Sequence, residues 1–205
     1  MGRSARMHSV SGSANTRADR RQQTADRISV HAQVLTDERG LDGWTMDDLA
    51  EASGVSRRTL FNYFPHKVDA VLGPQPELDD TAVATFRARD AGSDLVTDLR
   101  RLGSDLLEMR GLGREDLARS RRILVANPRL LAAAHARLLT VSSAIVELIR
   151  DREGAGFDAQ RAQIAVSVLA ALFDAALDRF IGEPRARTLA EAYDDVLRTA
   201  RQLLA

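Results

Sequence analysis

Residues 56–67, with the sequence SRRTLFNYFPHK, carry side chains suited to hydrogen bonding with a polyanion. Guanidinium, amide, hydroxyl, phenol and ammonium groups occur within about three helical turns, and a proline interrupts the run. A guanidinium can bind the edge of a guanine through two hydrogen bonds, whereas hydroxyl, amide and ammonium groups bind phosphates. The alternative is a short polar helix that only faces water, and the residue types alone leave both interpretations open.

A helical wheel separates the apolar from the polar side chains of this segment. The apolar side chains fall in one arc: Leu60, Phe64 and Phe61. The polar side chains fall in the opposite arc: Arg58, Asn62, Thr59 and Tyr63. A helix this short needs tertiary packing to be stable, so we expect the apolar arc to be buried against the preceding helices. Arg57 lies on the apolar side, and we expect it to reach a partner less readily than Arg58.

The elements that must position this helix are also predicted to be helical. A first helix is expected from about Ala18 to Arg39. A second begins at Thr45, whose hydroxyl can cap it while Asp48 reaches back, as in a capping box. It ends near residue 52, Gly54 makes a turn, and Ser56 caps the helix that extends to residue 64. Two short helices joined by such a turn form a helix-turn-helix, in which the second helix enters the major groove.

The run TMDDLAEASGVSRRTLFNYFPHKVDAVL, residues 45–72, resembles the helix-turn-helix signature of the TetR family of bacterial transcription regulators. The matching features are the alanine and glycine of LAEASGVS, then TL, an aromatic residue, YF and a lysine three residues later. The resemblance implies an all-α fold with a three-helix DNA-binding domain over residues 16–72. A larger helical domain for ligand binding and dimerisation would follow over residues 77–205. It also implies a repressor that binds a palindromic operator as a dimer and is released by a small effector.

The same resemblance assigns residues to the DNA surface. Those expected to face DNA are Arg58, Thr59, Asn62 and Tyr63. Lys67 would hold one phosphate, and Thr45 would bind another through its hydroxyl and free amides. Ser56 and His66 complete the expected surface. Two residues depart from the family pattern: Phe61 replaces a frequent tyrosine, and Asp47 stands where other members often carry a neutral or basic residue.

The rest of the chain divides into a basic arm, a linker and a helical body. Residues 1–15 are rich in Ser, Gly and Arg and are expected to be flexible, and GPQP at 73–76 marks a boundary. Helices are expected over 77–90, 94–110, 114–126, 128–153, 158–182 and 185–204. The helix over 158–182 is apolar over most of its circumference, so we expect a second subunit to cover one side, with the final helix alongside. The alternative is a central core helix of a monomer.

A ligand is expected in this body. RRTLFNYFPHKVDAVLG and a later helix that opens at NPRLLAA resemble an actinobacterial subgroup with an acyl-CoA-like ligand-binding domain. This resemblance implies an effector of the fatty acyl thioester type or another hydrophobic molecule. The candidate wall residues are Phe86, Leu102, Leu106, Met109, Leu138 and Phe173. Apolar residues at this spacing also suit an ordinary core.

The composition excludes several kinds of functional site. The net charge is zero, but residues 1–30 carry six arginines against two aspartates. The chain has no cysteine, which excludes disulfides, thiolate zinc sites and cysteine nucleophiles. No two of the four histidines are three or four residues apart, so there is no local pair of metal ligands and we expect no metal site. No motif in the sequence supports catalysis, and we expect no cofactor and no enzyme. We expect no signal sequence, because the N-terminus has no apolar run, and no segment long and apolar enough to cross a membrane without charges, so we expect a cytoplasmic protein. An α-helical interaction protein, or an enzyme that does not bind DNA, remains the alternative.

Overall fold

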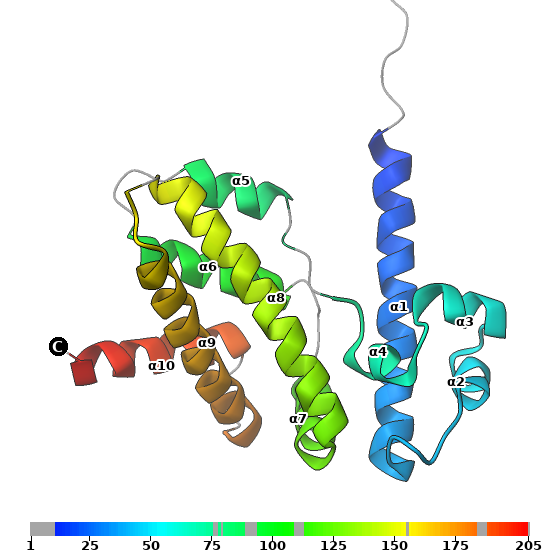
Figure 1. Cartoon of the computed structure of the whole chain (residues 1–205). Coiled ribbons are helices and arrows are strands. Elements are labelled where there is room, and N and C mark those ends of the chain that lie inside the picture. The colour runs from blue at the N-terminus through cyan, green and yellow to red at the C-terminus, as the bar shows by residue number, and fades with distance from the viewer. Residues whose placement is uncertain are drawn as a thin grey trace, which may run out of the picture. The chain divides into compact units, whose positions relative to one another are not determined.

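The computed structural model describes residues 11–75, 78, 80–88, 94–108, 113–154, 156–183 and 188–204. Over these ranges the chain forms ten α-helices and no β-strand, which confirms the all-α prediction (Figure 1). The helices belong to two compact units, Met1–Pro74 and Gln75–Ala205, and the division lies in the GPQP segment. Each unit has its own core.

The first unit contains α1 (Ser11–Arg39), α2 (Met46–Ser53), α3 (Arg57–Tyr63) and α4 (Lys67–Leu72). The long α1 packs against α2 and α4, and α2 packs against α3. The expected start of α1 near Ala18 is wrong, because the helix already includes residues 11–15 of the expected flexible arm. Between Gly12 and Gly40 the sequence contains neither glycine nor proline, so no helix-breaking residue separates residues 13–17 from the rest of α1.

An apolar stripe on α1 forms the base of the first core. Its residues recur at the spacing of one helix face: Ala25, Ile28, Ala32 and Leu35. They belong to a core that also buries Trp44, Leu49, Leu60 and Phe64. The indole Nε1 of Trp44 donates a hydrogen bond of 3.1 Å to Thr36 Oγ1, so this buried polar atom is satisfied. The connection between α1 and α2 is thereby fixed to α1.

The start of α2 is a capping box, as the sequence predicts. Thr45 Oγ1 accepts a hydrogen bond from the backbone N–H of Asp48 at 3.1 Å. The Asp48 carboxylate accepts from the backbone N–H of Thr45 at 2.6 Å and from its hydroxyl at 2.8 Å. These hydrogen bonds from Thr45 hold the pKa of Asp48 below its ordinary value.

Replacing Thr45 by alanine is expected to destabilise the first unit by about 0.5–2 kcal/mol, because an N-cap acceptor is lost. The pKa of Asp48 is lower in the folded chain than in the unfolded chain. The hydrogen bonds that its carboxylate accepts from Thr45 therefore stabilise the fold at pH values above the ordinary carboxyl pKa. This stabilisation is lost as the pH falls through the pKa of Asp48 in the folded chain. Urea unfolding followed by the fluorescence of Trp44, the single tryptophan, measures both effects. Glu51→Gln, an exposed change on α2, is the control; an equal loss for it would contradict the capping role.

The second unit contains α5 (Asp80–Ala88), α6 (Leu95–Glu108), α7 (Arg114–Ala126), α8 (Pro128–Glu153), α9 (Ala159–Gly182) and α10 (Leu189–Leu204). The long helix α8 starts at Pro128, and the Asn127 side chain caps it by accepting from two backbone N–H groups at 3.0 and 3.2 Å. After Gly154 the chain reverses into α9, which packs against α8, and α10 packs against α9 (Figure 1).

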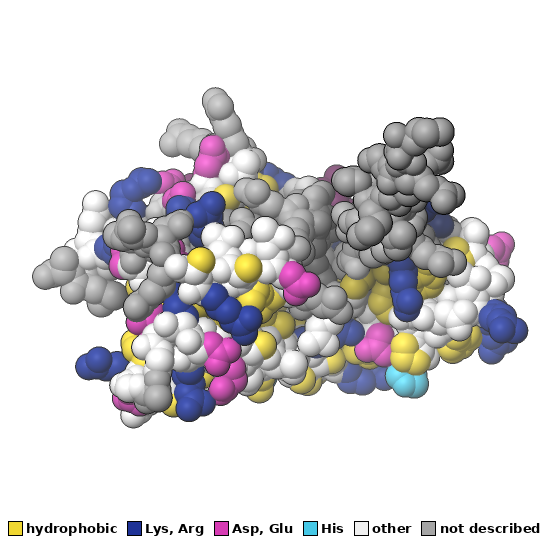
Figure 2. All heavy atoms as spheres, turned by 90° about the horizontal axis from the view of Figure 1, so that it is seen from above, with side chains coloured by type: hydrophobic (Ala, Val, Ile, Leu, Met, Phe, Trp, Pro, Cys, Tyr) yellow, Lys and Arg dark blue, Asp and Glu magenta, His cyan; other side chains and the backbone are white. Residues whose placement is uncertain are grey.

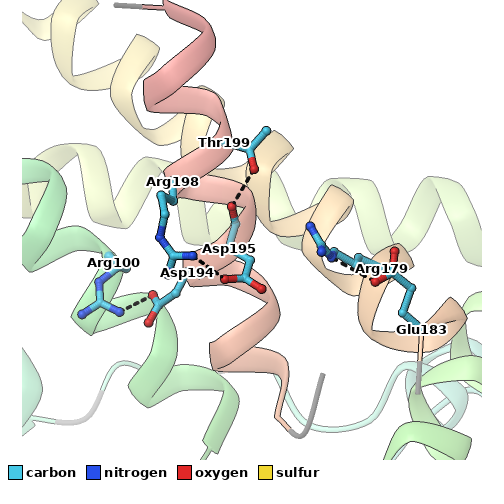
Figure 3. Close-up of polar contacts among 7 residues, drawn as sticks. All are labelled: Arg100, Arg179, Glu183, Asp194, Asp195, Arg198 and Thr199. Carbon is cyan, nitrogen blue, oxygen red and sulfur yellow. Dashed lines mark hydrogen bonds and ion pairs between the residues drawn. The ribbon is translucent and has the colours of Figure 1, made fainter. Parts of the chain in front are cut away.

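Two apolar clusters lie in the interior of the second unit, among the residues that the structure describes. One is formed by Phe86, Leu99, Leu102, Val146, Leu148, Ile149, Ala162 and Val166. The other is formed by Ala176, Phe180, Ala192 and Tyr193. Ion pairs supplement them: Arg100 of α6 pairs with Asp194 of α10, and within the end of α9 Arg179 pairs with Glu183 at 3.3 Å (Figure 3). Basic and acidic side chains are interspersed over the face visible in Figure 2.

A buried ion pair joins α6 to α8 inside this unit. The Arg152 side chain is 1% exposed, and its Nη2 donates to the carboxylate of Asp98. Its guanidinium carbon lies 4.7 Å from the centre of the Phe86 ring, so α5 also contributes to the environment of the charge. The sequence gives no sign of this pair, because its members are 54 residues apart.

Helix α8 bears on the expectation that no segment free of charges can span a membrane. By length and composition alone, Pro128–Glu153 is apolar enough to cross a membrane. Alanine and leucine are frequent in this helix, and its acidic residues lie toward its C-terminal end. A core helix of a water-soluble bundle passes the same test, and α8 packs against α5, α7 and α9. This one helix is therefore weak evidence for a membrane protein.

Candidate nucleic-acid interface

Helices α2 and α3 form the expected helix-turn-helix. Gly54 joins them in the left-handed conformation, with φ 64°, which glycine adopts without strain. Ser56 caps α3: its Oγ accepts from the backbone N–H of Thr59 at 3.1 Å and shares a hydrogen bond of 2.8 Å with the Thr59 hydroxyl. Leu60 is fully buried and Phe64 is 4% exposed, so these two side chains anchor α3.

The exposed side of α3 differs in part from the side that the wheel predicts. Arg58 and Asn62 are exposed as expected, but Thr59 and Tyr63 are only half-exposed. Phe61, expected to be a third anchor, is 40% exposed, and that expectation is wrong. The guanidinium carbon of Arg21 lies 5.8 Å from the centre of the Tyr63 ring, so a side chain of α1 covers the Tyr63 side of the helix. The buried arc is therefore rotated toward Tyr63 and away from Phe61.

Arg57 is also placed differently from the sequence prediction. Its side chain is 68% exposed, although the wheel puts it on the apolar side. Its Nη1 donates a hydrogen bond of 3.2 Å to Oδ2 of Asp47, at the start of α2. Its guanidinium carbon lies 5.6 Å from the centre of the Phe61 ring. The exposed surface of α3 therefore contains two guanidinium groups, an amide and an aromatic ring.

Lys67 begins α4 and has a structural role that the sequence does not reveal. Its Nζ donates to the carbonyl oxygen of Leu41 at 3.1 Å and to that of Trp44, and it lies 4.8 Å from the centre of the Trp44 ring. The ammonium group thus holds the connection between α1 and α2. An ammonium has three donors, so one remains for the expected phosphate.

Replacing Lys67 by methionine is expected to have two effects. The first unit loses hydrogen bonds to a charged group, which destabilises it by about 1.5–3 kcal/mol. Binding to every DNA duplex weakens, and the slope of log affinity against log salt falls by about one, because one phosphate contact is lost. Thermal unfolding followed by circular dichroism and salt titrations of DNA binding measure the two effects. A variant with wild-type stability and an unchanged salt slope would exclude both roles.

Two other residues expected at DNA lie on the same unit. The hydroxyl and backbone N–H of Thr45 both bond to Asp48, so a phosphate there would compete with a carboxylate. His66 is the N-cap residue of α4, is exposed, and makes no capping hydrogen bond through its side chain. The phosphate contact of Thr45 and the role of His66 stay predictions.

The residues expected to line a ligand pocket are not all brought together. Phe86 and Leu102 lie in one apolar cluster, whereas Phe173 packs against the other. Leu138 is 49% exposed on α8. The side chain of Leu106, and Met109, lie outside the described residues. The two clusters bury different residues, although Leu169 packs against both, and a sequence pattern cannot distinguish them because both use the same helical spacing.

Comparisons with known proteins agree with this geometry. Residues 31–71 match the TetR_N family model, described as bacterial regulatory proteins of the tetR family. The match covers the C-terminal part of α1 (residues 31–39) together with α2, α3 and most of α4, the helices that build and support the interface.

Among proteins of known function, the HTH-type transcriptional regulator TcmR of Streptomyces glaucescens is 26% identical over 141 residues. The match spans 66% of this chain and 62% of TcmR.

A solved structure shows a similar fold. A structure described as a TetR-family transcriptional regulator from Mesorhizobium loti MAFF303099 superimposes with a TM-score of 0.52 at 18% identity, over 90% of this chain and 98% of that chain. The TetR-family repressor FadR of Thermus thermophilus, in complex with lauroyl-CoA, is 26% identical over 85% of this chain and 91% of that chain. Its TM-score is 0.44, too low to transfer any feature of its ligand site.

Proposed function

We propose that this chain, a transcriptional regulator of the TetR family, is a repressor that binds a palindromic DNA operator as a homodimer. In this proposal α3 of each subunit enters the major groove of one half-site. The DNA surface comprises the residues expected from the sequence: Thr45, Ser56, Arg58, Thr59, Asn62, Tyr63, His66 and Lys67. A regulator of this family acts in the cytoplasm, where its DNA is found.

One observation carries the proposal. A seven-residue helix, too short to be stable alone, is anchored by the buried Leu60 and Phe64 and presents Arg58 and Asn62 to solvent. It follows α2 through a tight turn, in the order that a helix-turn-helix requires. Guanidinium and amide groups on such a helix match the donor and acceptor pattern of base edges.

A homodimer is proposed because a palindromic operator needs two reading helices about 34 Å apart. We place the contact on the last two helices, α9 and α10. Support comes from apolar side chains that the single chain leaves uncovered: Ile164 is 55% exposed, Val168 is 46% exposed and Leu203 is 81% exposed. A second copy would cover them through a two-fold contact of like surfaces.

The proposed effector is a small hydrophobic molecule, of acyl-CoA type, bound in the second unit. Its support is the resemblance of residues 57–73 and 127–133 to the subgroup with acyl-CoA-like ligands, and the apolar cluster around Phe86 and Leu102. To shift the regulator tenfold toward its released state, the effector must prefer that state by about 1.4 kcal/mol.

The test is selection of bound fragments from random duplex DNA by the whole chain, repeated with a long-chain acyl-CoA. We expect enrichment of a palindrome and weaker enrichment when the acyl-CoA is present. Selection without any enriched sequence, together with binding that does not depend on salt, would contradict DNA recognition and favour an α-helical interaction protein. An enriched palindrome that ignores the acyl-CoA would reject only the effector.

A further inference from the structure

We propose that Asp47 is a positioning residue that holds Arg57 in a conformation for reading a base, which makes Arg57 a second arginine of the DNA surface beside Arg58. The inference rests on the proposed function, because it assumes that α3 enters DNA. Its basis is a set of three side chains from two helices: the Asp47 carboxylate, the Arg57 guanidinium and the Phe61 ring.

The local structure explains why Asp47 is available for this contact. Asp48 turns back to Thr45 and completes the capping box, so its carboxylate is already engaged. Asp47, one residue earlier, is 62% exposed and takes no part in the cap. The turn at Gly54 then places Arg57, the first residue of α3, within 3.2 Å of Asp47.

The Asp47–Arg57 pair contributes little to folding. Both side chains are largely exposed, and ion pairs between exposed side chains contribute little to stability in water. The pair instead affects the orientation of the Arg57 guanidinium, which the Asp47 carboxylate and the Phe61 ring restrain together. A long side chain that is restrained before binding loses less conformational entropy when it meets its target. As DNA displaces water, the attraction between the two charges also strengthens.

The arrangement leaves Arg57 able to bind a base. A guanidinium has five N–H donors, and the hydrogen bond from Nη1 to Asp47 uses one of them. The remaining donors suffice for the two hydrogen bonds that arginine makes to the acceptors of guanine. The negative charge of Asp47 also repels phosphates, so the pair favours base contact over contact with the DNA backbone. The expected gain is in sequence preference more than in affinity.

The experiment is a double-mutant cycle on the whole chain with Asp47→Ala, Arg57→Ala and the double variant. Binding is measured to the selected operator, to operators with each base pair replaced in turn, and to an unrelated duplex. We expect Asp47→Ala to lower the preference at one base pair about tenfold, within the range of a single arginine–guanine contact. The same variant should bind the unrelated duplex more tightly. In the Arg57→Ala background, removing Asp47 should leave the remaining preference unchanged.

Two further variants separate positioning from charge. Asp47→Asn keeps a hydrogen-bond acceptor and should retain part of the preference. Glu51→Ala removes an exposed acid from the same helix and should strengthen binding to all duplexes alike. If Asp47→Ala behaves like Glu51→Ala in both backgrounds, Asp47 acts only through its charge and the inference is overturned while DNA binding stands. If the wild-type chain binds no duplex at low ionic strength, the proposed function itself fails, and the inference with it.

Discussion

Arg58→Ala is expected to weaken binding to the selected operator by about 1–3 kcal/mol, the contribution of one arginine that reads a base. Arg58 is exposed on α3, opposite the anchors Leu60 and Phe64, so its loss should not disturb the fold. The effect should be much smaller on an unrelated duplex, because a base contact carries sequence information and a phosphate contact does not. Fluorescence anisotropy with labelled duplexes measures both.

The matched control is Arg87→Ala, which removes an exposed arginine from α5 in the second unit. It should change operator affinity by less than about twofold, since surface changes away from a site have small effects. If Arg58→Ala weakened binding to the operator and to the unrelated duplex equally, Arg58 would not contact a base. From the helical wheel alone, Arg57→Ala should weaken DNA binding less than Arg58→Ala, because the wheel puts Arg57 on the apolar side. In the structure Arg57 is exposed, so this reason no longer holds.

Leu60→Ala is expected to destabilise the first unit by about 2–5 kcal/mol, because it removes a fully buried side chain and leaves a cavity. Phe61→Ala, one residue further, should cost about 1 kcal/mol or less, since its ring is 40% exposed. Trp44, the single tryptophan, is buried in this unit, so its fluorescence during urea unfolding follows the first unit specifically.

The contrast between these neighbours distinguishes the structure from the wheel. The wheel treats Leu60 and Phe61 as joint anchors and predicts large losses for both. The structure predicts one large and one small loss. A similar loss of stability for the two variants would mean that Phe61 is buried in solution and that α3 exposes a different face.

Local signals explain how much of the fold was predictable. The capping box at Thr45 and the left-handed Gly54 each depend on a few adjacent residues, so the start of α2 and the turn after it were predictable. Asn127 followed by Pro128 likewise marks the start of α8. Long amphipathic helices were also predictable, because their apolar spacing repeats over many residues.

Contacts between distant residues account for what could not be predicted. Lys67 bonds to carbonyl groups 23 and 26 residues earlier, and Arg57 pairs with an aspartate ten residues earlier. No spacing rule indicates these pairs, because the turn and the packing of α1 create them. The buried face of a seven-residue helix is also poorly defined by a wheel, and the contact of Arg21 with Tyr63 shows which side α1 covers.

The central claim is that the exposed side of α3 meets DNA, and cross-linking tests it most directly. The chain has no cysteine, so Asn62→Cys creates a unique attachment point for a photoactivated cross-linker on this side. Thr85→Cys, exposed on α5, is the matched control. We predict efficient cross-linking to the selected duplex from position 62, suppressed by rising salt, and none from position 85. Equal cross-linking from both positions, or none from position 62 while the duplex is bound, would contradict the account.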